Sequence, residues 1–334
     1  MTPIIYKIRS LPFHHSLRIF LIKIGFLRLR TKIRLFAWRA ERLFFRLFRR
    51  KKKICIFWKQ PSNSGLFAVF RYFLGGIAYA DRKALLPVID MKNTLNAYLY
   101  DDEVGQINSW EYYFEQPSGI ALDEAEQSGQ AVKLEIGGFL YPVPRQDIAF
   151  FTNQDGQLDY WRNICKRYIH FTKPVLERLA LLEKKYSGRK ILGVLLRGTD
   201  YIATRPYDHP IQPEPEAVIA KADEVMREKG FDAVYLATED KNILEKFRQA
   251  FGEKLLLPDA AYIDYDYSSG KWLSEYHIDR DNDKYLQGLE YLVSMLFLSR
   301  LKGFITSMTS GSQAVMYLSE GFDYLYVFDL GLYH

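Results

Sequence analysis

Short apolar runs rich in β-forming residues alternate with helical segments from residue 54 onward, and this alternation limits the possible folds more than any other feature. In the first half, ICIFWKQ (54–60) is followed by the turn PSNSG, a helical segment at 66–82 and a second apolar run, LLPVID (85–90). A strand, a glycine-containing loop, a helix and another strand form a βαβ unit with parallel strands.

The second half repeats this pattern. Strands are predicted at 190–196, 233–240, 254–258, 303–307 and 323–328, and helices at 213–230, 241–252, 283–301 and 310–321. Because alternating strands and helices require a parallel sheet that is covered on both faces, we predict an α/β protein with two Rossmann-like domains. We place these domains at 54–186 and 187–334, after a basic amphipathic helical segment at 1–53. The ligand is expected in the cleft at the carboxyl ends of the strands.

The regions between these elements are less regular. Residues 91–150 contain WEYYFEQP (110–117), which we interpret as core rather than as part of a site. Residues 155–186 are predicted to be helical, and residues 259–282 to form a polar loop rich in Tyr and Asp.

The first 53 residues carry the basic charge of the chain. They contain sixteen Lys and Arg and one acid, Glu41, so their net charge is +15, which leaves −9 for the remainder because the whole chain is +6. Cations recur at near-helical spacing among Leu, Ile and Phe, and no uncharged run reaches the roughly 18 residues of a spanning helix. We expect a helix on an anionic membrane surface, with Trp38 and the phenylalanines inserted. The alternatives are a helix packed on the body and an RNA-binding segment.

Two further features of the composition limit the function classes. The basic charge is not spread over the folded body, so we expect no nucleic-acid partner. Cys55 and Cys165 are too few for a disulfide framework and too widely spaced for a zinc site. We therefore expect a reducing, cytoplasmic location, peripheral on the inner face of the cell membrane.

Polar side chains follow three of the predicted strands in the second half. Because the carboxyl ends of parallel strands meet at one edge of a sheet, we expect these side chains to lie close together. An arginine offers a planar fork for phosphate oxygens, and a helix N-terminus adds free N–H groups, although a cap or an ion pair would also explain the pattern. The residues are Arg197, Thr199 and Asp200, then Glu239 and Asp240, and then Ser310, Ser312 and Gln313.

The segment VLLRGTDYIATRPYDHPI (194–211) resembles the motif region of the fucosyltransferase superfamily that includes the α1,6-fucosyltransferases and the protein O-fucosyltransferases. That region is often written HxRRxD. In the same order, YLATED resembles the acidic loop of the family, and GLEYLVSMLFLSRLKGFITSMTSGSQAVMY resembles its helix, strand and Ser-Gln loop. The resemblance covers about residues 190–320, with a weaker likeness of PSNSGLFAVFRYFLGG to the first loop and helix. It implies the GT-B arrangement, with the nucleotide sugar held mainly by the second domain.

The resemblance also implies roles for individual residues. Arg197 would hold the β-phosphate of the donor and stabilise the charge of the departing diphosphate in an inverting transfer. Asp200 would orient Arg197 or approach the sugar. No Asp-x-Asp motif lies at a strand end, which agrees with transfer that needs no metal and no cofactor besides the donor. The donor-binding residues implied are Gly65, Arg197, Thr199, Glu239, Asp240, Glu290, Ser310, Ser312 and Gln313.

Three positions depart from the family pattern. Leu195 and Ser294 stand where the family has the histidine and the aspartate that bind guanine, and Arg205 stands where the α1,6 enzymes have a glutamate proposed as the general base. GDP-fucose is therefore the leading donor among related nucleotide sugars. The candidates for the general base are Asp208, Glu239, Glu111 and Glu115.

Taken together, these features predict a membrane-associated glycosyltransferase of the bacterial polysaccharide type. Its acceptor would be a glycan or a lipid-linked saccharide precursor at the cytoplasmic face. Two alternatives stay open. One is an enzyme similar to the polysaccharide pyruvyltransferases, and the other is a non-catalytic membrane scaffold with a degenerate transferase fold.

Overall fold

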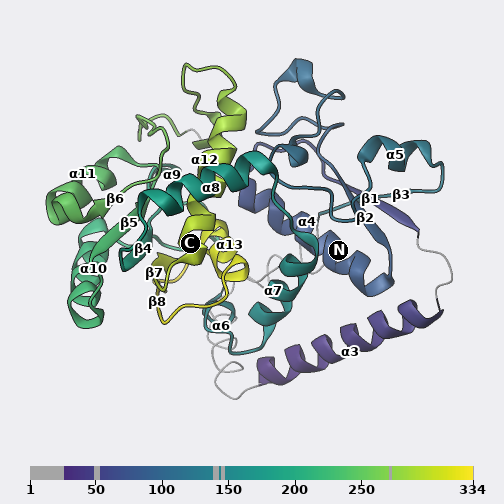
Figure 1. Cartoon of the computed structure of the whole chain (residues 1–334), viewed down its shortest axis with the longest axis horizontal. Helices are drawn as coiled ribbons and strands as arrows, with labels where there is room; N and C mark the ends of the chain where they lie inside the picture. The colour runs from purple at the N-terminus through teal and green to yellow at the C-terminus, as the bar shows by residue number, and fades with distance from the viewer. Residues whose placement is uncertain (1–25, 49–52, 138–142, 144–146, 271–272, 334) are drawn as a thin grey trace.

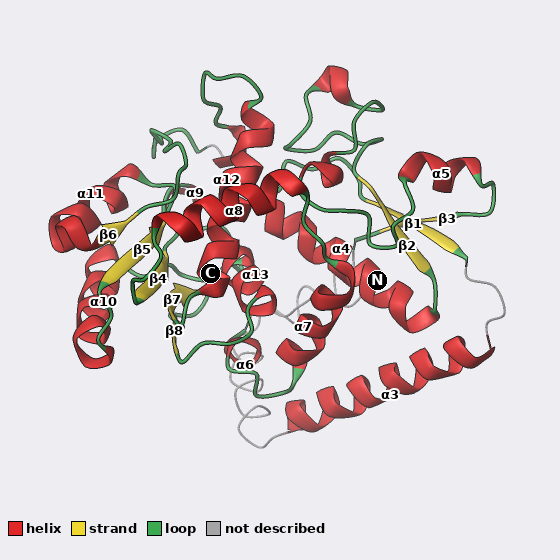
Figure 2. Ribbon diagram, in the orientation of Figure 1, coloured by secondary structure: helices red, strands yellow, loops and turns green. Residues whose placement is uncertain are grey.

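The computed structural model describes residues 26–48, 53–137, 143, 147–270 and 273–333. The strands are β1 (Ile54–Trp58), β2 (Leu86–Asp90), β3 (Val132–Glu135), β4 (Ile191–Leu195), β5 (Ala233–Ala237), β6 (Leu255–Leu256), β7 (Gly303–Ser307) and β8 (Tyr324–Phe328). The helices are α3 (Phe26–Phe48), α4 (Leu66–Lys83), α5 (Leu122–Gln127), α6 (Ile148–Phe151), α7 (Gln157–Tyr168), α8 (Lys173–Lys185), α9 (Asp200–Thr204), α10 (Pro215–Lys229), α11 (Lys241–Phe251), α12 (Asp283–Arg300) and α13 (Ser310–Leu318). Figure 1 and Figure 2 show two α/β units side by side.

The first unit contains a three-stranded parallel sheet in the order β2-β1-β3. Alternate residues of β1 face opposite sides, so that Phe57 packs in the core with α4 while Ile56 packs with Leu122 of α5. The predicted β1–α4–β2 unit is therefore confirmed. Strand β3 was not predicted, because it is an edge strand whose side chains are mostly exposed and follow no apolar pattern.

The second unit contains a five-stranded parallel sheet in the order β6-β5-β4-β7-β8. Leu192 and Val194 of β4 pack in one core cluster with residues of α10 and α11, whereas Ile191 and Leu195 belong to the cluster that contains residues of α8, α12 and α13. The sheet is covered on both faces, as the continuous apolar runs predicted. The prediction did not include the short helix α9, which begins directly after the strand-end turn.

Helix α12 joins the two units. The Tyr113 hydroxyl from the first unit donates to the Tyr285 carbonyl oxygen at 3.0 Å, and the Lys284 ammonium donates to the Leu99 carbonyl oxygen at 2.6 Å. A Cβ at Gly288 would lie 2.1 Å from the Tyr113 hydroxyl, so the glycine permits this close contact. Residues Trp110, Tyr113 and Phe114 are buried, which confirms that the aromatic segment 110–117 is core.

Helix α3 packs against the last turn of α4, and Figure 1 shows it at one edge of the molecule. Trp38 contacts the ring of Tyr160 at 5.1 Å and lies under the guanidinium of Arg82 at 4.5 Å. The expectation that Trp38 inserts into a membrane is therefore wrong, because this side chain faces the body. Residues 1–25 and 49–52 of the predicted basic segment lie outside the described residues. Among the helices described, none is sufficiently long and apolar to cross a membrane.

Candidate active site

Arg197 lies just after β4, at the carboxyl edge of the five-stranded sheet, and its guanidinium is held on several sides. Its Nη2 is 2.7 Å from Asp200 Oδ1, and its Nε is 3.2 Å from Glu239 Oε1. The ring of Tyr201 packs against it, with 4.9 Å from the Arg197 Cζ to the ring centroid. The side chain is 17% exposed, so this cation is fixed in place and nearly withdrawn from water.

The backbone of Thr199 is strained at this point. Its φ of 47° and ψ of −119° are unusual for a β-branched residue. The Thr199 N–H donates to Asp240 Oδ2 at 3.2 Å, and its hydroxyl donates to Glu239 Oε1 at 3.0 Å. The Gly198 N–H donates to the same Glu239 oxygen at 3.1 Å. Strain that neighbouring hydrogen bonds hold in place is concentrated at functional sites in proteins, which supports a function for this loop.

Asp200 and Asp240 use their carboxylate oxygens to fix the surrounding backbone. Asp200 Oδ1 accepts from Arg197 and from the Tyr201 N–H, and its Oδ2 accepts from the Leu273 N–H at 3.3 Å. Asp240 Oδ1 caps helix α11, and its Oδ2 also accepts from the Tyr267 hydroxyl. The structure thus places Asp200 where it orients Arg197, which was one of the two roles considered for it.

The charges of this cluster influence one another strongly. Burial disfavours the charged guanidinium, but the Glu239 and Asp200 carboxylates outweigh it and hold the pKa of Arg197 well above its ordinary value. Burial also raises the pKa of the Glu239 carboxyl, against the opposing effect of Arg197. Two acids thus face one largely buried cation.

The start of α13 forms a complete helix cap. The Thr309 hydroxyl accepts from the Ser312 N–H at 3.0 Å, and the Ser312 hydroxyl donates to the Ser307 carbonyl oxygen at 2.7 Å. Gly311 faces the hydroxyl of Tyr291, whose own pKa burial raises to about 12. Ser312 and Gln313 are buried. The donor-binding roles of Ser310, Ser312 and Gln313 stay predictions.

Glu290 forms its ion pairs with Arg280 and Arg178 rather than with Arg197. Its two carboxylate oxygens accept from Arg280 at 2.7 and 3.1 Å, and Arg178 is 3.8 Å away. The side chain therefore holds the loop before α12 against the helix. The structure gives Glu290 an ion-pairing role, and donor binding by this residue stays a prediction.

Leu195 and Ser294, the two positions at which the sequence departs from the base-binding motif, are both packed in the interior. Leu195 is buried in the sheet, and the Ser294 hydroxyl is hydrogen-bonded to the Tyr235 hydroxyl at 3.0 Å. Ser294 and Tyr235 are both buried, so the Ser294 hydroxyl is engaged within the protein.

Arg71 is a residue of interest that the sequence did not reveal. It lies on α4, and it lowers the pKa of both Tyr201 and Tyr317, although burial has the larger, opposite effect on each. Its Nε is buried and has no hydrogen-bond partner among the described residues. A single cation within the apolar segment LFAVFRYFLGG was the only available signal. The first unit thus brings a second arginine close to the tyrosine that packs on Arg197.

The candidate general bases occupy different settings. Glu111 accepts from the Gln116 amide at 2.8 Å within a structural network, and Glu115 and Asp208 are exposed. Glu239 alone among the four contacts Arg197. Within the described part of the chain, no group of His, Cys, Asp and Glu side chains could hold a metal ion.

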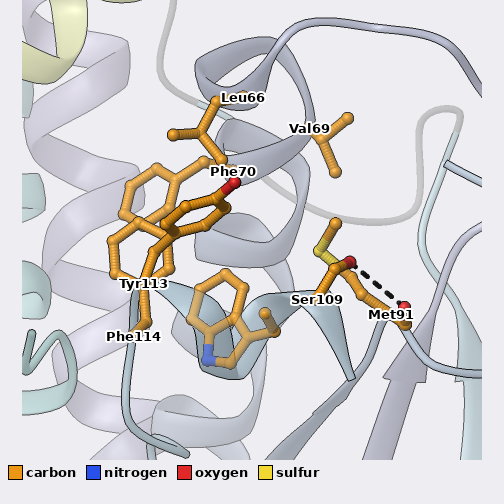
Figure 3. Close-up of a pocket in the computed structure, with 8 residues that line it drawn as sticks. Leu66, Val69, Phe70, Met91, Ser109, Tyr113 and Phe114 are labelled. Atoms are coloured by element: carbon orange, nitrogen blue, oxygen red, sulfur yellow. Dashed lines mark hydrogen bonds between the residues drawn. The ribbon is translucent and has the colours of Figure 1, made fainter. Parts of the chain in front are cut away.

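A small apolar pocket lies between α4 and the segment that contains Trp110 (Figure 3). Leu66, Phe70 and Phe114 line it. At its edge the Ser109 hydroxyl donates a hydrogen bond to the Met91 carbonyl oxygen at 3.2 Å, shown as a dashed line in Figure 3. The lining carries no charge, so we interpret this pocket as a packing space in the core. A second small pocket of mixed lining lies after β1 and β2. Val69, Phe73, Met91 and Leu95 line it together with the polar residues Lys59, Gln60, Ser62, Asp90, Thr94 and Asn96.

Gly65 precedes α4 and has open space around the position of a Cβ. Its φ of −61° suits any residue, so Gly65→Ala should leave the unfolding free energy within about 0.5 kcal/mol of the original. If the donor approaches this backbone closely, as predicted, the added methyl group should raise the KM for the donor severalfold. Urea unfolding and donor kinetics measure the two effects separately. An unchanged KM would remove Gly65 from the binding site.

The structure of the chain is similar to solved structures of fucosyltransferases. No family model matches the sequence, and no curated protein matches it either. The fucosyltransferase NodZ from Bradyrhizobium has 14% sequence identity and a TM-score of 0.47, covering 80% of this chain and 94% of NodZ. POFUT1 in complex with GDP-fucose has 11% identity and a TM-score of 0.48, covering 83% of this chain and 98% of POFUT1. At such low identity, the function of the chain must be inferred from its own residues.

Proposed function

We propose that this protein is a glycosyltransferase that takes its sugar from a nucleotide-sugar donor. The observation that carries the proposal is Arg197, a largely buried cation fixed by Asp200 and Glu239 at the carboxyl edge of a parallel sheet. Ligands of open α/β sheets bind at this edge, and a fixed guanidinium suits a diphosphate. The sequence motifs around 194–211 and 303–313 resemble those of the fucosyltransferase superfamily, which makes GDP-fucose the leading donor.

The chemistry follows from where charge develops. When the bond between the sugar and the diphosphate breaks, negative charge grows on the leaving phosphate oxygens. A guanidinium that is already positioned stabilises this charge more in the transition state than in the ground state. Arg197 would supply the first such charge and Arg71, from the facing unit, a second. We infer direct, inverting displacement without a metal ion from the motif resemblance.

The acceptor would enter from the first unit. The loop region after β1 and β2 carries Lys59, Gln60 and Ser62, whose ammonium, amide and hydroxyl groups are of the kinds that bind saccharide hydroxyls. It lies at the carboxyl edge of the smaller sheet, as the donor site does in the larger one. A glycan or lipid-linked saccharide is the acceptor class we propose.

A panel of nucleotide sugars tests the proposal on the full chain. A ligand that binds only the native state raises the melting temperature, so GDP-fucose, its diphosphate product and other nucleotide sugars can be ranked. We expect the largest shift with GDP-fucose or GDP, and release of GDP from GDP-fucose on incubation. A shift with phosphoenolpyruvate but with no nucleotide sugar would instead indicate a pyruvyltransferase. No shift with any of them would contradict the proposal.

Donor binding should strengthen as the pH falls. Burial raises the pKa of Glu239, and a diphosphate beside it would raise that pKa further, so binding should be accompanied by proton uptake. The same shift means that the native state holds more protons than the unfolded state, so this group's contribution to stability decreases as the pH rises through its folded pKa. Calorimetric titration of GDP in buffers of different ionisation enthalpy measures the uptake. Glu239→Gln should reduce it; an unchanged uptake would assign the proton elsewhere.

A further inference from the structure

Helix α3 has two faces, and only one of them is covered by the protein. The side chains at positions 31, 35, 38, 42 and 45 are buried or half-buried against the body. Their spacing of three and four residues places them on one side of the helix. Leu35 is 8% exposed, which shows how closely this side is packed.

Ion pairs fix the covered face in one orientation. The buried Asp81 carboxylate on α4 lies 3.0 Å from Arg42 Nε, 2.9 Å from Arg167 Nη1 and 2.8 Å from the Tyr168 hydroxyl. Glu41 is paired with the Lys83 ammonium on the same side. Because α3 is held at both α4 and α7, its opposite face points away from the protein.

That opposite face is apolar along the whole helix. Its large side chains are between 58% and 74% exposed, and they recur at the same three- and four-residue spacing. Phe44 and Phe48 widen it toward the end of the helix. We call these residues the outer stripe: Leu29, Ile33, Phe36, Ala40, Leu43 and Leu47.

We propose that the outer stripe docks on an anionic lipid surface, with α3 lying parallel to the membrane. Cations border the stripe, since Lys32, Arg39 and Arg46 are exposed and recur every seven residues along one flank. An apolar face with basic flanks is the pattern of helices that lie in the membrane interface. Five further cations follow directly in the sequence at 49–53, and each basic residue near an anionic surface adds attraction.

A second copy of the chain is the competing occupant, because spacing of this kind also builds coiled coils. Such pairs usually carry flanking charges of both signs. Here the flank is uniformly basic, and the one acid of the helix, Glu41, is paired on the covered face. Two copies of α3 would bring like charges together, whereas anionic lipid neutralises them. The charge pattern therefore favours the membrane.

Docking through α3 leaves the candidate active site open. Helix α4 contacts α3 at its last turn, and its first turn contacts α12, where the Phe67 and Tyr291 rings are 5.2 Å apart. The rise from Leu66 to Asp81 is about 22 Å along the helix axis. The membrane surface and the sheet edge with Arg197 thus lie near opposite ends of α4, so that lipid does not cover the residues around Arg197.

Vesicle flotation of the full-length protein tests the proposal. We expect binding to phosphatidylcholine vesicles that contain about one quarter phosphatidylglycerol, weak binding without the anionic lipid, and release at high salt. The combined variant Phe36→Ser, Leu43→Ser and Leu47→Ser should lower the affinity at least tenfold, roughly what the lost burial of one large apolar side chain would cause. These side chains are exposed, so the fold should persist. The control Leu176→Ser with Leu181→Ser changes exposed leucines of α8 and should bind as before.

A site-specific probe distinguishes the two faces. Cys55 and Cys165 are buried, so a cysteine introduced at Phe36 can be labelled selectively with an environment-sensitive fluorophore. Its emission should shift to the blue on anionic vesicles, whereas a probe at Leu181→Cys should not shift. Equal binding by the outer-stripe variant would overturn the proposal. So would a lipid-independent dimer that this variant abolishes, since a second copy would then be the occupant.

Discussion

Replacing Arg197 by alanine should reduce sugar transfer about 10³-fold, since removing one fixed charge that faces a developing anion typically costs this much. The loss should appear mainly in kcat, because the guanidinium is proposed to act most strongly on the departing diphosphate. Release of the nucleoside diphosphate, followed with saturating donor and acceptor, measures it. Full activity of Arg197→Ala would end the proposed role.

The control must separate chemistry from folding, because Arg197→Ala leaves the Asp200 and Glu239 carboxylates facing each other without a cation. Arg189→Ala is the matched control, since this arginine is exposed just before β4, at the opposite edge of the sheet. It should retain activity and stability. If Arg197→Ala does not fold, the double variant Arg197→Gln and Glu239→Gln removes both charges of the pair. That variant should fold, and its activity should lie well below that of Glu239→Gln alone, so that the further loss reports on Arg197.

The parts of the fold that the sequence predicted are those with a strong local cause. Strands such as 191–195 and 233–237 are continuous apolar runs because both faces of a parallel sheet are buried. Once the strands are parallel, the loops that follow them share one edge of the sheet. The contact between Arg197 and Glu239 could therefore be predicted from the order of the elements alone, although these residues are far apart in the sequence.

The rest depends on contacts that no local pattern encodes. Arg71 comes near Tyr201 because α4 packs against α13 of the second unit. The bonding of Glu290 depends on Arg280, which a long polar loop brings back against the helix. Helix α3 shows the same limitation. Its amphipathic spacing predicted an interface but not what that interface contacts. Trp38 packs against Tyr160 and Arg82, which belong to elements later in the sequence.

Gly198→Ala should disrupt stability and donor binding together. A Cβ at this position would lie 2.1 Å from Asp240 Oδ2 and 2.8 Å from the Asp240 Cβ, so the loop or the start of α11 must move. Asp240 also caps that helix and accepts from the Thr199 N–H, and both bonds would be strained. We expect a loss of about 2 kcal/mol in the free energy of unfolding, by overpacking and partial loss of the cap.

The effect on binding distinguishes a damaged site from general destabilisation. Gly193→Ala, in the middle of β4, would place a Cβ 2.6 Å from Leu298 Cδ2, the flexible end of a core side chain. It should also lower stability, yet it leaves the strand-end loop unchanged. Donor titration below the melting temperature should therefore show weaker binding for Gly198→Ala alone. If the two variants lose stability equally and bind GDP equally well, the strained geometry of residues 198–200 is not required to hold the diphosphate. If only Gly198→Ala loses affinity, the hydrogen-bonded loop that positions Arg197 is itself part of the binding site.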